Sequence, residues 1–306
     1  ETTDQAFWDK YNLNTDWQKE IFRNAISQNY QLSATGGTKA TTYYFSGSWV
    51  DQNGIVLNNN VKRATFKANV DHQLTKILKI GTSLSYDNWK DVSVSENDRN
   101  GVITRLYTSI PNIGIRDPNE PGAYARSPFI NDLENPVSTV YQPEQLFAND
   151  RLHGNAYAEV DVIEGLKFKS LFGFESTVGK FKSFQDSIQT RWGKSNAGIA
   201  SETDYNYKYW VSENTANYNR KIQEHSISLL AGFIISRETT DDVYRTSKDF
   251  SLATNGNTDV GSGKVLSPDM PTFIQKSHLS YIGRINYSYK DKYYLTSNFR
   301  ADGSGQ

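Results

Sequence analysis

The sequence predicts an all-β protein of about ten antiparallel, up-and-down strands forming part of a large transmembrane β-barrel. Two observations predict this fold. Strand-length segments of alternating apolar and polar residues run through most of the 306 residues, which gives each segment one apolar and one polar face. The connections are lopsided, with short turns at one end of the segments and long loops at the other. That asymmetry is typical of a barrel whose two rims face different compartments.

The segment 63–74 shows the alternation. Phe66 and Val70 fall on one face, whereas Lys67 and Asn69 fall on the other. In a lipid-embedded barrel the apolar face looks outward and the polar face lines the lumen. Reading the other segments in the same way, we expect the following side chains to face lipid: Phe66, Val70, Leu84, Val160 and Ile285.

Ten strands are expected, each near or above the roughly nine to eleven residues that a tilted strand needs to cross a bilayer. Their approximate spans are 28–36, 41–50, 61–74, 78–92, 151–163, 166–178, 205–221, 224–237, 278–289 and 292–302. The turns at Thr75-Lys76 and Glu164-Gly165 are expected to be periplasmic. The two longest connections, 92–150 and 239–277, are expected to be extracellular loops.

Two short helices accompany the strands. Thr15-Asp16-Trp17-Gln18 has the form of a capping box, and Trp17, Ile21 and Ala25 would then share one helical face. A second helix is expected within 98–109, ending before Pro111 because the residue before a proline disfavours helix.

The amino-acid composition is compatible with a β-barrel but does not by itself identify the fold class. The chain is 37% hydrophobic and has no apolar run of the about twenty residues that a transmembrane helix needs. The nineteen Tyr, fifteen Phe and six Trp fit aromatic girdles at the membrane interfaces, or simply the preference of aromatic residues for strands. A net charge of -1 with interspersed signs argues against a nucleic-acid partner, which would need a basic stripe.

The sequence shows no chemistry of an enzyme. It has no cysteine, so neither disulfides nor thiolate metal sites can form. The four histidines, His72, His153, His225 and His278, fall on four different expected strands without metal-ligand spacing. Gly261-Ser262-Gly263-Lys264 fails as a phosphate-binding loop because Val265 stands where Ser or Thr is required. No cofactor, metal or catalytic residue is therefore expected.

Several longer blocks carry a specific resemblance. They are Asn14-Thr15-Asp16-Trp17-Gln18-Lys19-Glu20-Ile21-Phe22-Arg23, Gln28-Asn29-Tyr30-Gln31-Leu32-Ser33, Thr42-Tyr43-Tyr44-Phe45-Ser46-Gly47, Asp51-Gln52-Asn53-Gly54-Ile55-Val56, Leu78-Lys79-Ile80-Gly81-Thr82-Ser83-Leu84-Ser85-Tyr86 and Tyr294-Leu295-Thr296-Ser297-Asn298-Phe299-Arg300-Ala301-Asp302-Gly303-Ser304. Together they span nearly the whole chain. In content and order they resemble the SusC/RagA family of TonB-dependent outer-membrane transporters.

The resemblance implies an architecture and a function. Family members have a barrel of about 22 strands around an N-terminal plug, so residues 1–306 are expected to form part of the first half of a barrel. The absence of a basic and apolar leader at Glu1-Thr2-Thr3-Asp4-Gln5 agrees with an internal piece whose plug, TonB-contacting region and closing strands lie outside this sequence. The implied function is TonB-dependent import of a large nutrient, an oligosaccharide or a peptide, across the outer membrane. The implied partners are a SusD-like surface lipoprotein, the TonB complex, outer-membrane lipid and the substrate itself.

Candidate substrate-binding residues lie where a strand meets the longest loop. An aromatic ring beside polar side chains suits a sugar, which stacks on the ring and hydrogen bonds at its edge. The candidates are Asn88, Trp89, Asp91, Arg99, Arg105 and Tyr107. Trp89 has an alternative interpretation as a residue of the interface girdle.

A secreted all-β adhesin or carbohydrate-binding module is the rival hypothesis, because sandwich strands also alternate. One consistently short rim and one consistently long rim over ten strands favour the barrel. An incomplete barrel is expected to form an open arc rather than a closed cylinder.

Overall fold

The computed structural model describes residues 12–96, 101–129, 133–250 and 259–305. Ten long strands form one antiparallel sheet in the order of the sequence, and the short β9 pairs with β8. The strands are β1 (Ser27–Gly37), β2 (Thr41–Asn53), β3 (Asn60–Gln73), β4 (Leu78–Ser93), β5 (Glu144–Ile163), β6 (Leu166–Gln185), β7 (Ile199–Ile222), β8 (His225–Lys248), β9 (Val265–Leu266), β10 (Met270–Tyr289) and β11 (Tyr293–Gly305). The all-β, up-and-down prediction is confirmed.

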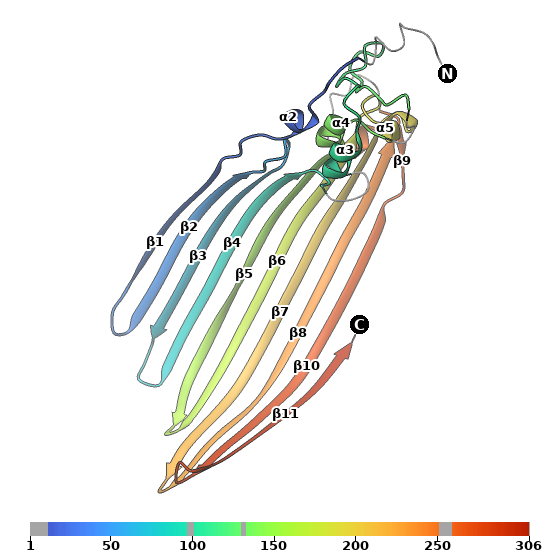
Figure 1. The fold of residues 1–306 in the computed structure, drawn as a ribbon. Coiled ribbons are helices and arrows are strands. Elements are labelled where there is room, and N and C mark those ends of the chain that lie inside the picture. Colours follow the sequence, from blue (N-terminus) through green and yellow to red (C-terminus); the bar gives the residue numbers. More distant parts are fainter. Residues whose placement is uncertain (1–11, 97–100, 130–132, 251–258, 306) are drawn as a thin grey trace.

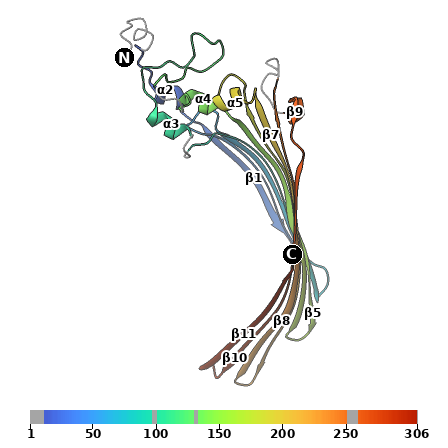
Figure 2. The same ribbon diagram turned by 90° about the vertical axis from the view of Figure 1, so that its right-hand side faces the viewer.

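The sheet is an open, curved wall. β1 and β11 each have one neighbour in the described sheet, so it has two free edges (Figure 1). Figure 2 shows the strands bending together, with the helices gathered at one end. The arc expected for part of a barrel is what the chain forms.

Short and long connections separate to opposite ends of the wall (Figure 1). Three-residue or shorter links join β1 to β2, β5 to β6, β7 to β8 and β10 to β11, and residues 74–77 join β3 to β4. Gly165 makes one of these turns possible, since its φ of 83° is a left-handed conformation that side chains disfavour. At the other end lie α2 (Trp17–Ile21), α3 (Val102–Thr108), α4 (Pro136–Tyr141), α5 (Arg191–Ser195) and the 3-10 turn η1 (Val260–Ser262).

The helices pack into a small core above the strands. Trp17, Ile21, Val102, Leu106 and Val140 are buried together there. Trp17 also donates a hydrogen bond from Nε1 to the carbonyl oxygen of Ile110, at 3.1 Å. The core therefore joins the segment before β1 to the long connection between β4 and β5. Among the described residues, no helix has the length and apolarity to cross a membrane.

Two details of the first predicted helix were wrong. The N-cap is Asp16, whose side chain accepts from the Lys19 backbone N–H, rather than Thr15. Thr15 instead donates its hydroxyl to the carbonyl oxygen of Ile113, at 2.6 Å. The helix ends at Ile21 because Phe22 is extended and bridges to Val56, so Ala25 lies outside it. The second predicted helix is present as α3.

The two long loops are shorter than predicted. The connection expected over 92–150 lies between Ser93 and Glu144, and the one expected over 239–277 lies between Lys248 and Met270. The strands β5 to β8 and β10 continue into stretches that lack a regular alternation of apolar and polar residues. Ladder hydrogen bonds to neighbouring strands stabilise such stretches even where both faces are polar, so alternation alone ends these strands too early.

The register fixes which side chains share a face, because residues directly opposite in an antiparallel pair point the same way. Phe66 lies opposite Tyr86 and Tyr86 opposite Leu152; Ile285 lies opposite Leu229. We call the side of the sheet that carries these residues the apolar face and the opposite side the polar face. All five side chains predicted to contact lipid lie on the apolar face: Phe66, Val70, Leu84, Val160 and Ile285.

Arginine on the apolar face should destabilise the full-length barrel. We expect Phe66→Arg or Leu84→Arg to cost about 2–4 kcal/mol near the bilayer midplane, because the guanidinium would enter hydrocarbon. The measurement is a denaturant titration of folding into lipid vesicles. Asn69→Arg, on the polar face of the same strand as Phe66, is the matched control and should cost far less. Equal losses would refute the assignment of faces.

The end of the wall with short turns should face the periplasm. In intact cells carrying the full-length protein, a cysteine at Thr75 should resist a membrane-impermeant thiol reagent, whereas one at Asn119 should react. The native residues 1–306 contain no cysteine to interfere. Permeabilised cells serve as the control, in which both positions should react. Labelling of Thr75 but not Asn119 in intact cells would invert the topology.

Candidate functional site

Alternation along β4 divides the predicted substrate residues between the two faces. Trp89 and Asp91 lie on the polar face, whereas Asn88 lies on the apolar face with its register partner Asp150. Asn88 Nδ2 donates to Asp150 Oδ1 at 2.9 Å, and the Tyr86 hydroxyl donates to the same oxygen. The grouping of Asn88 with Trp89 was therefore wrong, because adjacent side chains of a strand point to opposite sides.

The candidates in the long connection are also separated. Arg105 is 8% exposed on the side of α3 that packs into the helix core, so it is placed for structure rather than for contact with a substrate. Tyr107, two residues further on, is 76% exposed. Arg99 lies outside the described residues. Arg105 and Tyr107 belong to α3 in the long connection, whereas Trp89 belongs to β4.

What the polar face does bring together is a row of side chains across five strands. Trp89 lies opposite Asn149, Asn149 opposite Gly179, Gly179 opposite Tyr205 and Tyr205 opposite Asp242. The row thus places two aromatic rings, an amide and a carboxylate along one line of the wall. We call these five residues the aromatic row.

Glycine is required in the middle of this row. A Cβ at Gly179 would lie 2.0 Å from Asn149 Oδ1, so only glycine lets the Asn149 amide cross the backbone of β6. Asn149 is consequently 2% exposed. Its Nδ2 and the Asp242 Oδ1 are both covered, and neither has a hydrogen-bond partner among the described residues. Covered polar atoms without a partner are costly.

Below the aromatic row the polar face carries ion pairs. Arg151 Nη2 lies 2.8 Å from Glu175 Oε2, and the Thr65 hydroxyl donates to Asp87 Oδ1 at 2.8 Å. Tyr207 is adjacent, since it lies opposite Thr177, the register partner of Arg151. Polar and aromatic groups thus continue along the wall over several strands.

Of the aromatic row, only Trp89 was predicted from the sequence as a substrate-binding residue. A signal was present, because Tyr205, Tyr207 and Tyr209 alternate along β7 and so share one face. Asn149, Gly179 and Asp242 had no local signal. Their proximity depends on the register between strands that are distant in sequence.

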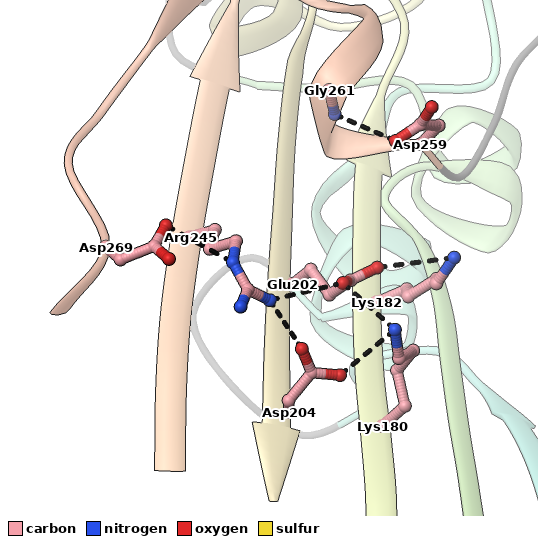
Figure 3. A network of polar contacts seen from close by, with 8 residues as sticks. All are labelled: Lys180, Lys182, Glu202, Asp204, Arg245, Asp259, Gly261 and Asp269. Atoms are coloured by element: carbon pink, nitrogen blue, oxygen red, sulfur yellow. Dashed lines mark hydrogen bonds and ion pairs between the residues drawn. The ribbon is translucent and has the colours of Figure 1, made fainter. Parts of the chain in front are cut away.

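The opposite face carries a network of charges at the helix end of the wall (Figure 3). Lys180 Nζ lies 3.1 Å from Glu202 Oε1 and 3.0 Å from Asp204 Oδ1. Arg245 contacts Asp204 and lies 3.2 Å from Asp269 Oδ1. The network joins β6, β7 and β8 to the segment that enters β10.

A cavity of about 240 Å³ adjoins this network on the same face. Phe184 and Ala200 line it from the sheet, Val260 of η1 lines it from the connection, and Lys182 and Glu202 link it to the charges. Phe184 packs edge-on against Phe250, with ring centroids 5.3 Å apart. These contacts attach the connection between β8 and β10 to the sheet.

Metal ligation is not indicated in the part of the chain that the structure describes, where no group of three or more His, Asp or Glu side chains is placed to hold an ion. The histidines have other contacts: His72 Nδ1 lies 2.7 Å from the Thr41 hydroxyl, and His225 Nδ1 lies 2.7 Å from the Tyr287 hydroxyl.

Comparison with curated proteins gives relatives of one kind. The chain is 30% identical over 315 aligned residues to TonB-dependent receptor P3 of Formosa agariphila, covering 98% of the chain and 31% of that protein. It is 24% identical to the TonB-dependent receptor SusC of Bacteroides thetaiotaomicron, covering 96% of the chain and 30% of that protein. The chain therefore spans about a third of the length of these relatives. No protein-family model matches it.

Solved structures agree on the fold. The RagAB peptide transporter matches with a TM-score of 0.77 at 24% identity, covering 96% of this chain and 33% of that one. The ferric citrate transporter FecA matches with a TM-score of 0.55 at 9% identity, covering 92% of this chain and 38% of that one. Both share the up-and-down barrel wall. From this fold and from the sequence relatives together, we conclude that the chain is a barrel segment of the SusC/RagA-like TonB-dependent receptors, which reside in the outer membrane.

Proposed function

We propose that the protein to which this segment belongs imports a large nutrient, an oligosaccharide or a peptide, across the outer membrane in a TonB-dependent manner. The observation that carries this proposal is the division of one sheet into an apolar face, which suits lipid, and a polar face with a continuous band of aromatic and charged groups. A barrel with such a lumen offers a solute a wet path through the membrane.

The names of the relatives support the same proposed function. SusC and P3 are TonB-dependent receptors, and RagAB is a peptide transporter. By analogy with these proteins, we propose a SusD-like lipoprotein as a lid on the extracellular side and the TonB complex as the partner on the periplasmic side. TonB would act through a region outside residues 1–306. We propose a transport role without catalysis.

The aromatic row is the part of this segment best suited to contact the solute. Trp89 and Tyr205 provide flat apolar rings, and the carboxylate of the half-buried Asp242 provides a hydrogen-bond acceptor beside Tyr205. This combination binds either a sugar or a peptide, because both present apolar surfaces beside hydrogen-bonding groups. We propose Trp89 and Asp91 as substrate-facing residues, together with the exposed Tyr107 at the rim.

The proposed function predicts a growth phenotype that depends on the proton gradient. Deletion of the gene should abolish growth of the native host on at least one member of a panel of oligosaccharides and peptides, and the full-length gene should restore it. Uptake of the identified nutrient should stop when a protonophore collapses the gradient, since TonB transmits that energy. Uptake that persists at the same rate with the protonophore would contradict TonB dependence.

Substitution in the aromatic row should weaken binding of the imported nutrient. Replacing Tyr205 of the row and Tyr207 just below it by alanine should cost about 1 kcal/mol per ring, from lost contact with the solute. Isothermal titration of the purified full-length protein measures the affinity. Tyr281→Ala removes an equally large ring from the apolar face, where Tyr281 is 54% exposed, and should leave the affinity unchanged. An equal loss of affinity for Tyr281→Ala would contradict the proposed contact between the aromatic row and the solute.

A further inference from the structure

Toward the helix end of the sheet, apolar side chains on the apolar face give way to cations. Along β6 the apolar side chains Phe172 and Phe174 give way to Lys180. Along β8, Phe233 and Ile235 give way to Arg237. The exposed fractions of Phe172, Phe233 and Ile235 are 50%, 44% and 39%, so these side chains offer apolar surface to acyl chains on either side of Ser212 and Asn214 of β7. We expect the first cations above that surface to lie where lipid headgroups begin.

Two of these cations are available to a ligand. Lys208 and Arg237 are exposed, and neither makes an ion pair with a described residue. Arg237 donates only from Nε to the Ser277 hydroxyl, at 3.3 Å. In contrast, Lys180 and Arg245 are held by Asp204. Lys208 and Arg237 therefore stand apart from the charge network of Figure 3.

The surroundings of these two cations suit a phosphate. Trp210 lies directly opposite Arg237 and, two residues after Lys208, is the next residue on the same face of β7. Its ring stacks on Phe172, with centroids 6.4 Å apart. The register partners of Lys208 are Ser176 and Thr239, whose hydroxyls are donors and carry no charge. No carboxylate is a register partner of either cation.

We propose that Lys208 and Arg237 bind the phosphate of an anionic lipid of the outer membrane, with Trp210 at the level of its headgroup. Cationic side chains at a membrane interface attract anionic headgroups, and an indole ring prefers that interface. A lipid is favoured over free phosphate because the site continues directly into the apolar surface of Phe172 and Phe233. The acyl chains of a bound lipid would cover that surface while its phosphate contacts both cations. This role concerns the outer wall of the barrel and is independent of the imported nutrient.

Native mass spectrometry of the full-length protein tests the proposal. The probes are phosphatidylglycerol, which is anionic, and phosphatidylcholine with the same acyl chains, which is zwitterionic. Phosphatidylglycerol should bind more tightly. The double variant Lys208→Gln with Arg237→Gln should bind it roughly thirty-fold more weakly, because each cation near a membrane surface contributes about a factor of five. The matched control, Arg63→Gln with Lys67→Gln, removes two cations from the polar face and should bind it as the native protein does.

Three outcomes would overturn the proposal. Equal affinity for the two lipids would exclude a role for headgroup charge. An equal loss in the control pair would show a general effect of net charge. Displacement of phosphatidylglycerol by equimolar inorganic phosphate would identify a site for the free ion. If the double variant fails to fold, binding to the native protein at rising salt decides, since a contact between cations and phosphate must weaken with ionic strength and constant affinity would refute it.

Discussion

The structure depends on one constraint: backbone N–H and C=O groups in hydrocarbon have no water to bond with, so each must find a partner in the protein. Within the sheet this constraint is met by pairing each long strand with its neighbours in sequence, and only the outer edges of β1 and β11 are left free in the described sheet. The side chains of each face then only need to suit the medium that they contact, which is lipid on one face and water on the other. That freedom explains how one chain carries Phe172 and Phe233 on one face and ion pairs such as Arg151–Glu175 on the other.

The same constraint explains what could be read from the sequence. Within the bilayer the two faces meet different media, so apolar and polar residues must alternate, and the strands around Phe66, Leu84 and Ile285 could be predicted. Short turns and long connections could also be predicted, because they follow from the two rims. Beyond the bilayer both faces meet water and alternation is no longer required. The extension of β8 through Lys248 therefore resembled a loop in the sequence.

The candidate site was predictable only in part, for a related reason. A residue such as Trp89 can be placed on a strand and near a rim from the sequence alone. The partners of Trp89 in the aromatic row come from β5, β6, β7 and β8, and their alignment is set by register rather than by any local pattern. Asn88 shows the converse case. It is adjacent to Trp89 in sequence, yet its side chain lies on the opposite face of the sheet because side chains alternate along a strand.

The consecutive order of the strands also bears on how the wall assembles. Every long strand pairs with the one that follows it, and the links at the short-turn end contain only a few residues. Closing such small loops costs little chain entropy, so five hairpins can form locally. The longer connections then join one hairpin to the next, and their greater length adds only a logarithmic term to the entropy of closure. Folding of this wall is thus expected to proceed by addition of neighbouring hairpins, a route whose rate is governed by sequence separation between contacts rather than by the size of the finished barrel.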